Sequence, residues 1–227
     1  MAITTVGLTA SSINPGATHN ATAAIAPAPC STLIGIVSEY YTVLPATNYP
    51  VMGGCATWSR KKTTTFMQGM RLSLFVGTAP LSNGQVSIDF AIAPTYLQAC
   101  ILSCGDADRQ YVDLTQTKST TGLASMFQSG MVAWSSSQSG ALIASVSTAL
   151  TSPSSPELSQ VIFEDDVLKL FVAQRSTAPS NPNLRVDNSS MAYFALIGIE
   201  IANASVAKTR FTVDHIGKTS FTVRDTP

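Results

Sequence analysis

Charged residues are scarce in this chain and absent from its first part. No Asp, Glu, Lys or Arg occurs before Glu39, and the 227 residues include only 13 basic and 13 acidic side chains. A soluble monomer of this size normally carries charge on about a quarter of its residues. Here the fraction is 11 %, the net charge is zero and the mean hydropathy is +0.22. We therefore expect much of the folded surface to face other protein rather than water.

Apolar residues alternate with polar ones along much of the chain, which predicts an all-β fold. The clearest example is the segment with Val86, Ile88, Phe90 and Ile92, and the helix formers Glu and Lys are scarce. Residues 96–103 fit a strand or a short helix equally well. The other predicted strands are Leu33–Leu44, residues 70–76, residues 85–93, Tyr111–Leu114, Met131–Trp134, Ala141–Val146, Val167–Ala173, Ala192–Ile201, Arg210–Asp214 and Ser220–Arg224.

The segments between these strands indicate how the chain is organised. Residues 1–30 are rich in Ala, Thr, Ser and Pro and lack a regular period, so we predict an extended N-terminal arm. Gly53-Gly54 with the run Trp58–Lys62, and residues 176–190, are typical of loops. No linker and no internal repeat of the propeller kind is found. Residues 31–227 are thus predicted to form one domain, an eight- to ten-stranded antiparallel jelly-roll β-sandwich.

One basic cluster stands out in the sequence. Arg60, Lys61 and Lys62 are adjacent and are followed by three threonines, so they could contact phosphates of a nucleic acid without sequence preference. A solvated loop is the simpler alternative for three adjacent cations.

Acidic residues gather at two places, where they could bind Ca²⁺ shared between subunits. Neither place has a twelve-residue calcium loop, and solvated turn charges or salt bridges explain the same pattern. The two groups are Asp106 with Asp108, and Glu164, Asp165 and Asp166.

Catalytic and cofactor motifs are missing from the sequence. The chain has two histidines, and His215 follows Asp214 on a predicted strand, where neighbours point to opposite faces. We predict neither an enzyme nor a bound cofactor. No run of about 18 uninterrupted apolar residues predicts a transmembrane helix, and Met1 is expected to begin a mature chain without a secretion signal.

The Ala/Thr/Pro-rich arm, the strands with long loops after it, and the strands near the C-terminus (Ala192–Ile201 and Ser220–Arg224) together resemble a known family. These features are similar to the single-jelly-roll coat proteins of small non-enveloped icosahedral viruses. Because residues 1–38 lack Lys and Arg, the chain resembles coat proteins with neutral arms, such as those of the tymoviruses, rather than those with basic arms.

The resemblance implies a structural capsid protein that assembles with many copies of itself into an icosahedral shell around a genome, an RNA in the simplest case. It implies a virion location, with assembly in the cytoplasm of a host cell. The composition leaves another class open, namely a non-catalytic β-sandwich surface protein such as a phage decoration or tail protein or a carbohydrate-binding module.

Overall fold

The computed structural model contains fifteen β-strands and no helix in the part of the chain that it describes. That part comprises residues 5–13, 16–29, 31–66, 69–104, 109–119, 123–131, 140–148, 152–158, 160–165, 170–176, 179–181 and 183–203. The all-β prediction is confirmed. The expected eight to ten strands were too few, because several short or polar strands carry little apolar signal.

Two five-stranded antiparallel sheets form the centre of the molecule. The first inner sheet consists, in spatial order, of β1 (Thr5–Ile13), β8 (Tyr96–Cys104), β3 (Thr32–Tyr40), β6 (Met70–Thr78) and β5 (Thr57–Phe66). The second inner sheet consists of β12 (Gln160–Asp165), β13 (Leu170–Arg175), β11 (Gly140–Ser147), β15 (Phe194–Asn203) and β9 (Arg109–Ser119).

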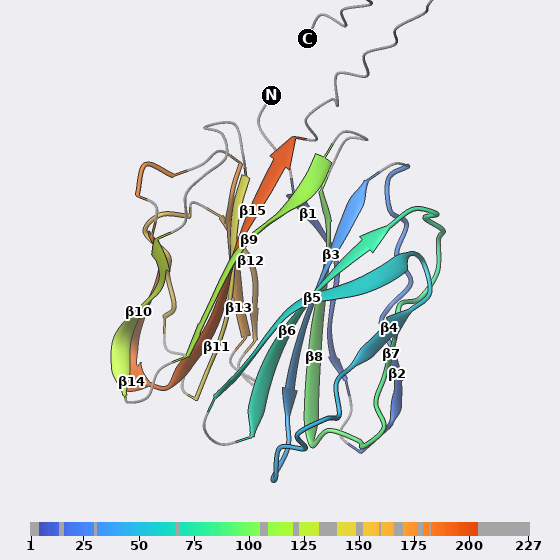
Figure 1. Cartoon of the computed structure of the whole chain (residues 1–227), viewed down its shortest axis with the longest axis horizontal. Helices are drawn as coiled ribbons and strands as arrows, with labels where there is room; N and C mark the ends of the chain where they lie inside the picture. The colour runs from blue at the N-terminus through green and yellow to red at the C-terminus, as the bar shows by residue number, and fades with distance from the viewer. Residues whose placement is uncertain are drawn as a thin grey trace, which may run out of the picture.

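A smaller sheet covers the outer face of each inner sheet (Figure 1). The first outer sheet consists of β2 (His19–Ala21), β7 (Ser87–Asp89) and β4 (Val51–Gly53). The second outer sheet consists of β10 (Ala124–Met131) and β14 (Asn183–Ala192). Four layers therefore lie side by side, with the second outer sheet at the left of Figure 1 and the first at the right.

Three apolar cores hold these layers together. Ile36, Leu74 and Leu102 of the first inner sheet pack against Val172 and Ile197 of the second. A second core joins the first inner sheet to the first outer sheet, and a third joins the second inner sheet to β10 and β14. Because central strands such as β3 are buried on both faces, they are almost continuously apolar instead of alternating.

The two halves of the chain repeat the same strand order. Residues 5–104 give the order β1-β8-β3-β6-β5, and residues 109–203 give β9-β15-β11-β13-β12, so each strand of the first inner sheet has a counterpart in the second. The outer strands correspond as well, with β2 and β7 matching β10 and β14. We call residues 5–104 the first repeat and residues 109–203 the second repeat. No sequence repeat indicated this duplication.

Irregularities in strand pairing fall at matching positions in the two repeats. The β5–β6 ladder shifts between Arg60 and Lys62, and the equivalent β12–β13 ladder shifts between Val161 and Phe163. In the outer sheets, Val51 of β4 pairs with Asp89, while Ser154 forms a single bridge to Asp187 in place of a full strand. The repeats therefore agree in register as well as in strand order.

Part of the predicted N-terminal arm lies within the first repeat. Residues 5–13 form β1 and pair with β8 of the same chain, and His19–Ala21 form β2. The predicted boundary after residue 30 therefore falls between β2 and β3. Large apolar residues are few in this segment, although Leu8 and Ile25 pack in the second core, and the backbone of β1 supplies the hydrogen bonds of an edge strand.

Two predicted loops are strands, and these predictions were wrong. The run Trp58–Lys62 belongs to β5, where charged side chains are tolerated because the strand lies at a sheet edge. Most of residues 176–190 belongs to β14, whose buried Leu184 and Val186 alternate with polar residues. The ambiguous residues 96–103 form β8. Arg210–Asp214 and Ser220–Arg224 lie outside the described residues.

Candidate functional site

The predicted basic cluster is divided over different positions of an edge strand. Arg60 pairs with Phe75, which packs toward the first outer sheet, whereas Lys62 pairs with Leu74, which packs toward the second inner sheet. Lys61 lies at the ladder shift between them. Arg60 and Lys61 are exposed and Lys62 is partly buried. The structure therefore places the three cations on one strand but does not bring them onto one face.

Arg60 borders a groove beside the first outer sheet. The groove encloses about 420 Å³ and is mostly apolar, with Thr47 and Arg60 as its polar members. The guanidinium of Arg60 lies 3.9 Å from the ring centre of Tyr49, and the guanidinium of Arg71 lies 4.5 Å from the same ring. These cation–π contacts hold Arg60 in one place at the rim of the groove.

Two glycines make room for the wall of this groove. A Cβ atom on Gly77 would lie 2.9 Å from the Trp58 ring, and one on Gly35 would lie 2.8 Å from the methyl carbon of Met52. Only residues without a side chain therefore allow Trp58 and Met52 to lie against the first inner sheet. The Trp58 indole N–H donates to the carbonyl of Gly54 at 2.9 Å, which fixes the ring.

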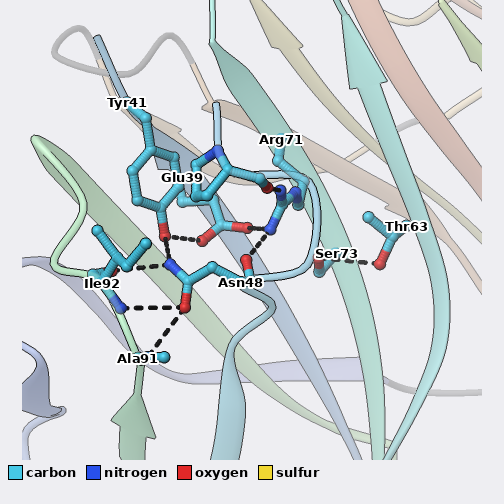
Figure 2. Close-up of polar contacts among 9 residues, drawn as sticks. Glu39, Tyr41, Asn48, Thr63, Arg71, Ser73, Ala91 and Ile92 are labelled. Atoms are coloured by element: carbon cyan, nitrogen blue, oxygen red, sulfur yellow. Dashed lines mark hydrogen bonds and ion pairs between the residues drawn. The ribbon is translucent and has the colours of Figure 1, made fainter. Parts of the chain in front are cut away.

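A buried ion pair lies next to the groove. Arg71 of β6 and Glu39 of β3 approach to 3.0 Å, with 1 % and 0 % of their side chains exposed (Figure 2). The hydroxyl of Tyr41 donates to the other oxygen of Glu39 at 2.9 Å. Burial raises the pKa of Glu39 to about 7, although Arg71 and Tyr41 oppose this shift. Burial and the Glu39 charge also raise the pKa of Tyr41.

Asn48 connects this ion pair to two loops (Figure 2). Its amide nitrogen donates to the Tyr41 hydroxyl at 2.9 Å and to the Ile92 carbonyl at 2.8 Å. Its amide oxygen accepts from the backbone N–H groups of Ala91 and Ile92 at 2.9 and 3.1 Å. Arg71 donates to the carbonyls of Pro45 and Asn48. Together these contacts fasten residues 41–50 to residues 90–95.

Apolar side chains are exposed on and beside these fastened loops. Val43 is 83 % exposed, and Tyr49, Val51, Ile92 and Tyr96 are also exposed. We call these five residues the apolar end. Loops normally expose polar residues, and a soluble monomer rarely gathers apolar ones in this way. Rigid loops that present apolar side chains are suited to protein contacts rather than to catalysis.

Arg71 contacts the same Tyr49 ring as Arg60 but differs from the basic cluster in its partners. Because its guanidinium is buried and contacts Glu39 and two carbonyls, it is not available to bind phosphate. Sequence reasoning missed this network, although the sequence contains a signal for it. Glu39 and Arg71 are single charges at the ends of the apolar segments 33–37 and 72–76, and opposite charges inside neighbouring buried strands are expected to pair.

The structure describes only part of the two acidic groups. Asp106, Asp108 and Asp166 lie outside the described residues, while Glu164 and Asp165 belong to β12. Within the described ranges, no three His, Cys, Asp or Glu side chains gather in a way that could hold a metal ion. The described residues likewise contain no helix long and apolar enough to span a membrane.

Comparison with known proteins adds no family. No protein-family model, curated protein or solved structure is significantly similar to this chain.

Proposed function

We propose that each repeat is a small jelly roll. A jelly roll has eight strands in two sheets, with two Greek-key connections. In the first repeat, one sheet carries the first, last, third and sixth strands (β1, β8, β3 and β6) and the other the second, seventh and fourth (β2, β7 and β4). The order of these strands supports the proposal. β5 departs from the jelly-roll pattern, because it pairs with β6 at the edge of the inner sheet instead of joining β4 in the outer sheet. The chain would then contain two jelly rolls in tandem rather than one.

We further propose that the chain is a structural subunit that assembles with copies of itself into a closed coat. The apolar end carries this proposal, because its five exposed side chains lie on, or at the strand ends beside, loops that a buried network holds in place. A rigid apolar surface on a chain with 11 % charged residues would be buried in an assembly. Jelly rolls are common in viral capsids, and this agrees with the proposal.

A carbohydrate-binding role is less well supported by the groove. Sugar binding generally uses the open face of an aromatic ring. In the groove, both arginines lie over Tyr49, and Trp58 packs against Gly35 and Gly77. The arginines occupy the Tyr49 ring, and one side of the Trp58 ring lies against the inner sheet, so less aromatic surface is left for a sugar.

An enclosed genome, RNA in the simplest case, and its contact with Arg60, Lys61 and Lys62 stay predictions. Since the cations point to different faces, they are better suited to a few separate phosphate contacts than to one binding patch. Replacing all three with Ser should modestly lower the nucleic acid recovered in purified particles, measured by absorbance at 260 nm.

Assembly is tested directly by light scattering and negative-stain microscopy of the purified chain. We expect uniform closed particles at micromolar concentration. Val43→Ser combined with Ile92→Ser should reduce their yield, because these side chains are exposed on the proposed contact surface and should not affect the core. Leu123→Ser, at an exposed apolar residue of the second repeat, is the control. A wild-type chain that stays monomeric across salt and pH would contradict the proposal.

A further inference from the structure

The basic cluster and one acidic cluster occupy equivalent edge strands. Arg60, Lys61 and Lys62 lie on β5, the last strand of the first inner sheet, and Glu164 and Asp165 lie on β12, the last strand of the second. Within the described residues each strand pairs with one neighbour only, β6 or β13. Each therefore presents a second row of backbone N–H and C=O groups that its sheet does not use.

The two edges lie on opposite sides of the molecule. β5 lies beside β9 of the other inner sheet, and β12 lies beside β1, so one side of the sandwich presents β5 with β9 and the other presents β1 with β12. One copy can thus offer a basic edge to a neighbour on one side and an acidic edge to a neighbour on the other.

We infer that β5 of one copy pairs edge to edge with β12 of a second copy, which extends an inner sheet across the contact. This inference rests on the proposed self-assembly and names the surface that carries it. Backbone hydrogen bonds would supply affinity, as in other cases of strand addition. The net positive charge of β5 and the net negative charge of β12 would favour this partner edge over one of like charge.

The signs of the charges distinguish this pairing from the alternative that the charges only protect the edges against association. Many proteins place charges on edge strands to prevent association. Protection is achieved when all edges carry the same sign, because copies then repel one another. Here two equivalent edges of one chain carry opposite signs, and the edge strand β1 carries no charge at all. Opposite signs attract copies in one orientation only.

The contact joins different surfaces on the two copies, so it repeats from copy to copy. When β5 meets β12, β9 of the first copy comes beside β1 of the second, and both inner sheets continue into the neighbour. Such head-to-tail contacts close into rings when the rotation between copies allows it. A closed coat needs at least one contact of this kind between neighbours.

Two charge-reversed variants test the pairing. The first carries Arg60→Glu, Lys61→Glu and Lys62→Glu, which makes both edges acidic. The second carries Glu164→Lys and Asp165→Lys, which makes both edges basic. Light scattering at low salt should show association at least about tenfold weaker for each variant alone. An equimolar mixture should recover it, since each variant then supplies the edge that the other lacks.

Further variants keep the inference testable. Circular dichroism checks that each variant is folded, and Lys61→Glu, at an exposed position on the ladder shift, replaces the triple variant if that one unfolds. Asp89→Lys, on the middle strand of the first outer sheet, is the control and should leave association unchanged.

Several outcomes would overturn the inference. One is normal association of both charge-reversed variants, and another is an equimolar mixture that does not recover association. A third is stronger association when Arg60, Lys61 and Lys62 are replaced with Ser, which would show that the cations protect the edge. A Ser variant that assembles normally with less nucleic acid would assign the cations to the genome. In these cases wild-type particles would still form, so the proposed function would stand. A wild-type chain that stays monomeric would contradict both the proposed assembly and the edge pairing.

Discussion

Arg71 and Glu39 form a buried ion pair, 3.0 Å apart, between two neighbouring strands of the first inner sheet. In the second repeat Ser147 stands at the position of Glu39, according to the matching registers of the two inner sheets, so the carboxylate of this pair has no equivalent at that position. Among the described residues, the first repeat has the three-residue strand β4 where the second has the single bridge from Ser154 to Asp187, and the groove lined by Tyr49, Trp58 and Arg60 lies in the first repeat. The ion pair thus accompanies the loops that distinguish one repeat from the other.

Stability should fall as pH rises through the titration of Glu39. The pKa of Glu39 is about 7 in the fold against an ordinary value of 4.5, so the folded state binds more protons between these values. The free energy of unfolding should therefore decrease by about 3 kcal/mol from pH 4.5 to pH 7 because of this group. Urea unfolding of the wild type and of Glu39→Gln at pH 5 and pH 8 measures the difference. Equal pH dependence in the two proteins would contradict this assignment.

Removing Arg71 should destabilise the protein more at pH 8 than at pH 5. Arg71→Leu leaves Glu39 ionised and buried without a cation at high pH, which costs about 3–5 kcal/mol. At pH 5 Glu39 can take up a proton, so the loss should be smaller. Adding Glu39→Gln to Arg71→Leu should remove most of this pH difference. Denaturant unfolding of the single and double variants provides the comparison.

Asn48→Ala should loosen the loops of the apolar end. The substitution removes the partners of the Ala91 and Ile92 N–H groups and of the Ile92 carbonyl, at a cost of about 2–3 kcal/mol. Hydrogen exchange at Ala91 and Ile92 should become faster, while exchange at Ile88 of β7 should change little. Asn181→Ala is a matched control, because Asn181 is exposed and its contact with Glu157 lies in the second repeat. If the control loses as much stability as Asn48→Ala, the role assigned to Asn48 is wrong.

The sequence predicted the class of fold better than its arrangement. Strands with a strong apolar signal, such as Ala141–Val146 and residues 70–76, were located correctly as β11 and β6. The charged edge strand β5 was assigned to a loop, because an edge strand needs few apolar residues. The duplication left no sequence signal, since equivalent core positions such as Leu74 and Val172 need only be apolar and of suitable size.

The candidate site was less predictable for a different reason. Arg60, Lys61 and Lys62 are adjacent in sequence, but the shift in the β5–β6 ladder and the alternation of a strand place Arg60 and Lys62 toward opposite faces. Tyr49 and Arg60 are brought together only by the chain reversal through β4, which no local pattern encodes. Sequence spacing therefore identified the cations but not their partners.

Gly77→Ala should destabilise the wall of the groove, and a smaller residue at position 58 should compensate. The added Cβ would lie 2.9 Å from the Trp58 ring and 3.0 Å from the Cβ of Ala56, so either the indole or the strand has to move. Overpacking of this kind costs about 1–3 kcal/mol. Trp58→Leu removes the clash, although it also loses buried area and the hydrogen bond to Gly54.

The two substitutions should therefore be less than additive in a double-mutant cycle. Gly77→Ala should cost clearly less stability in the Trp58→Leu background than in the wild type, as measured by chemical unfolding. A change in tryptophan fluorescence in Gly77→Ala would not by itself show a clash, because fluorescence responds to small shifts of the ring. A fully additive cycle would show that Trp58 does not limit the space above Gly77, and the glycine would then be required for another reason, such as its contact with Ala56.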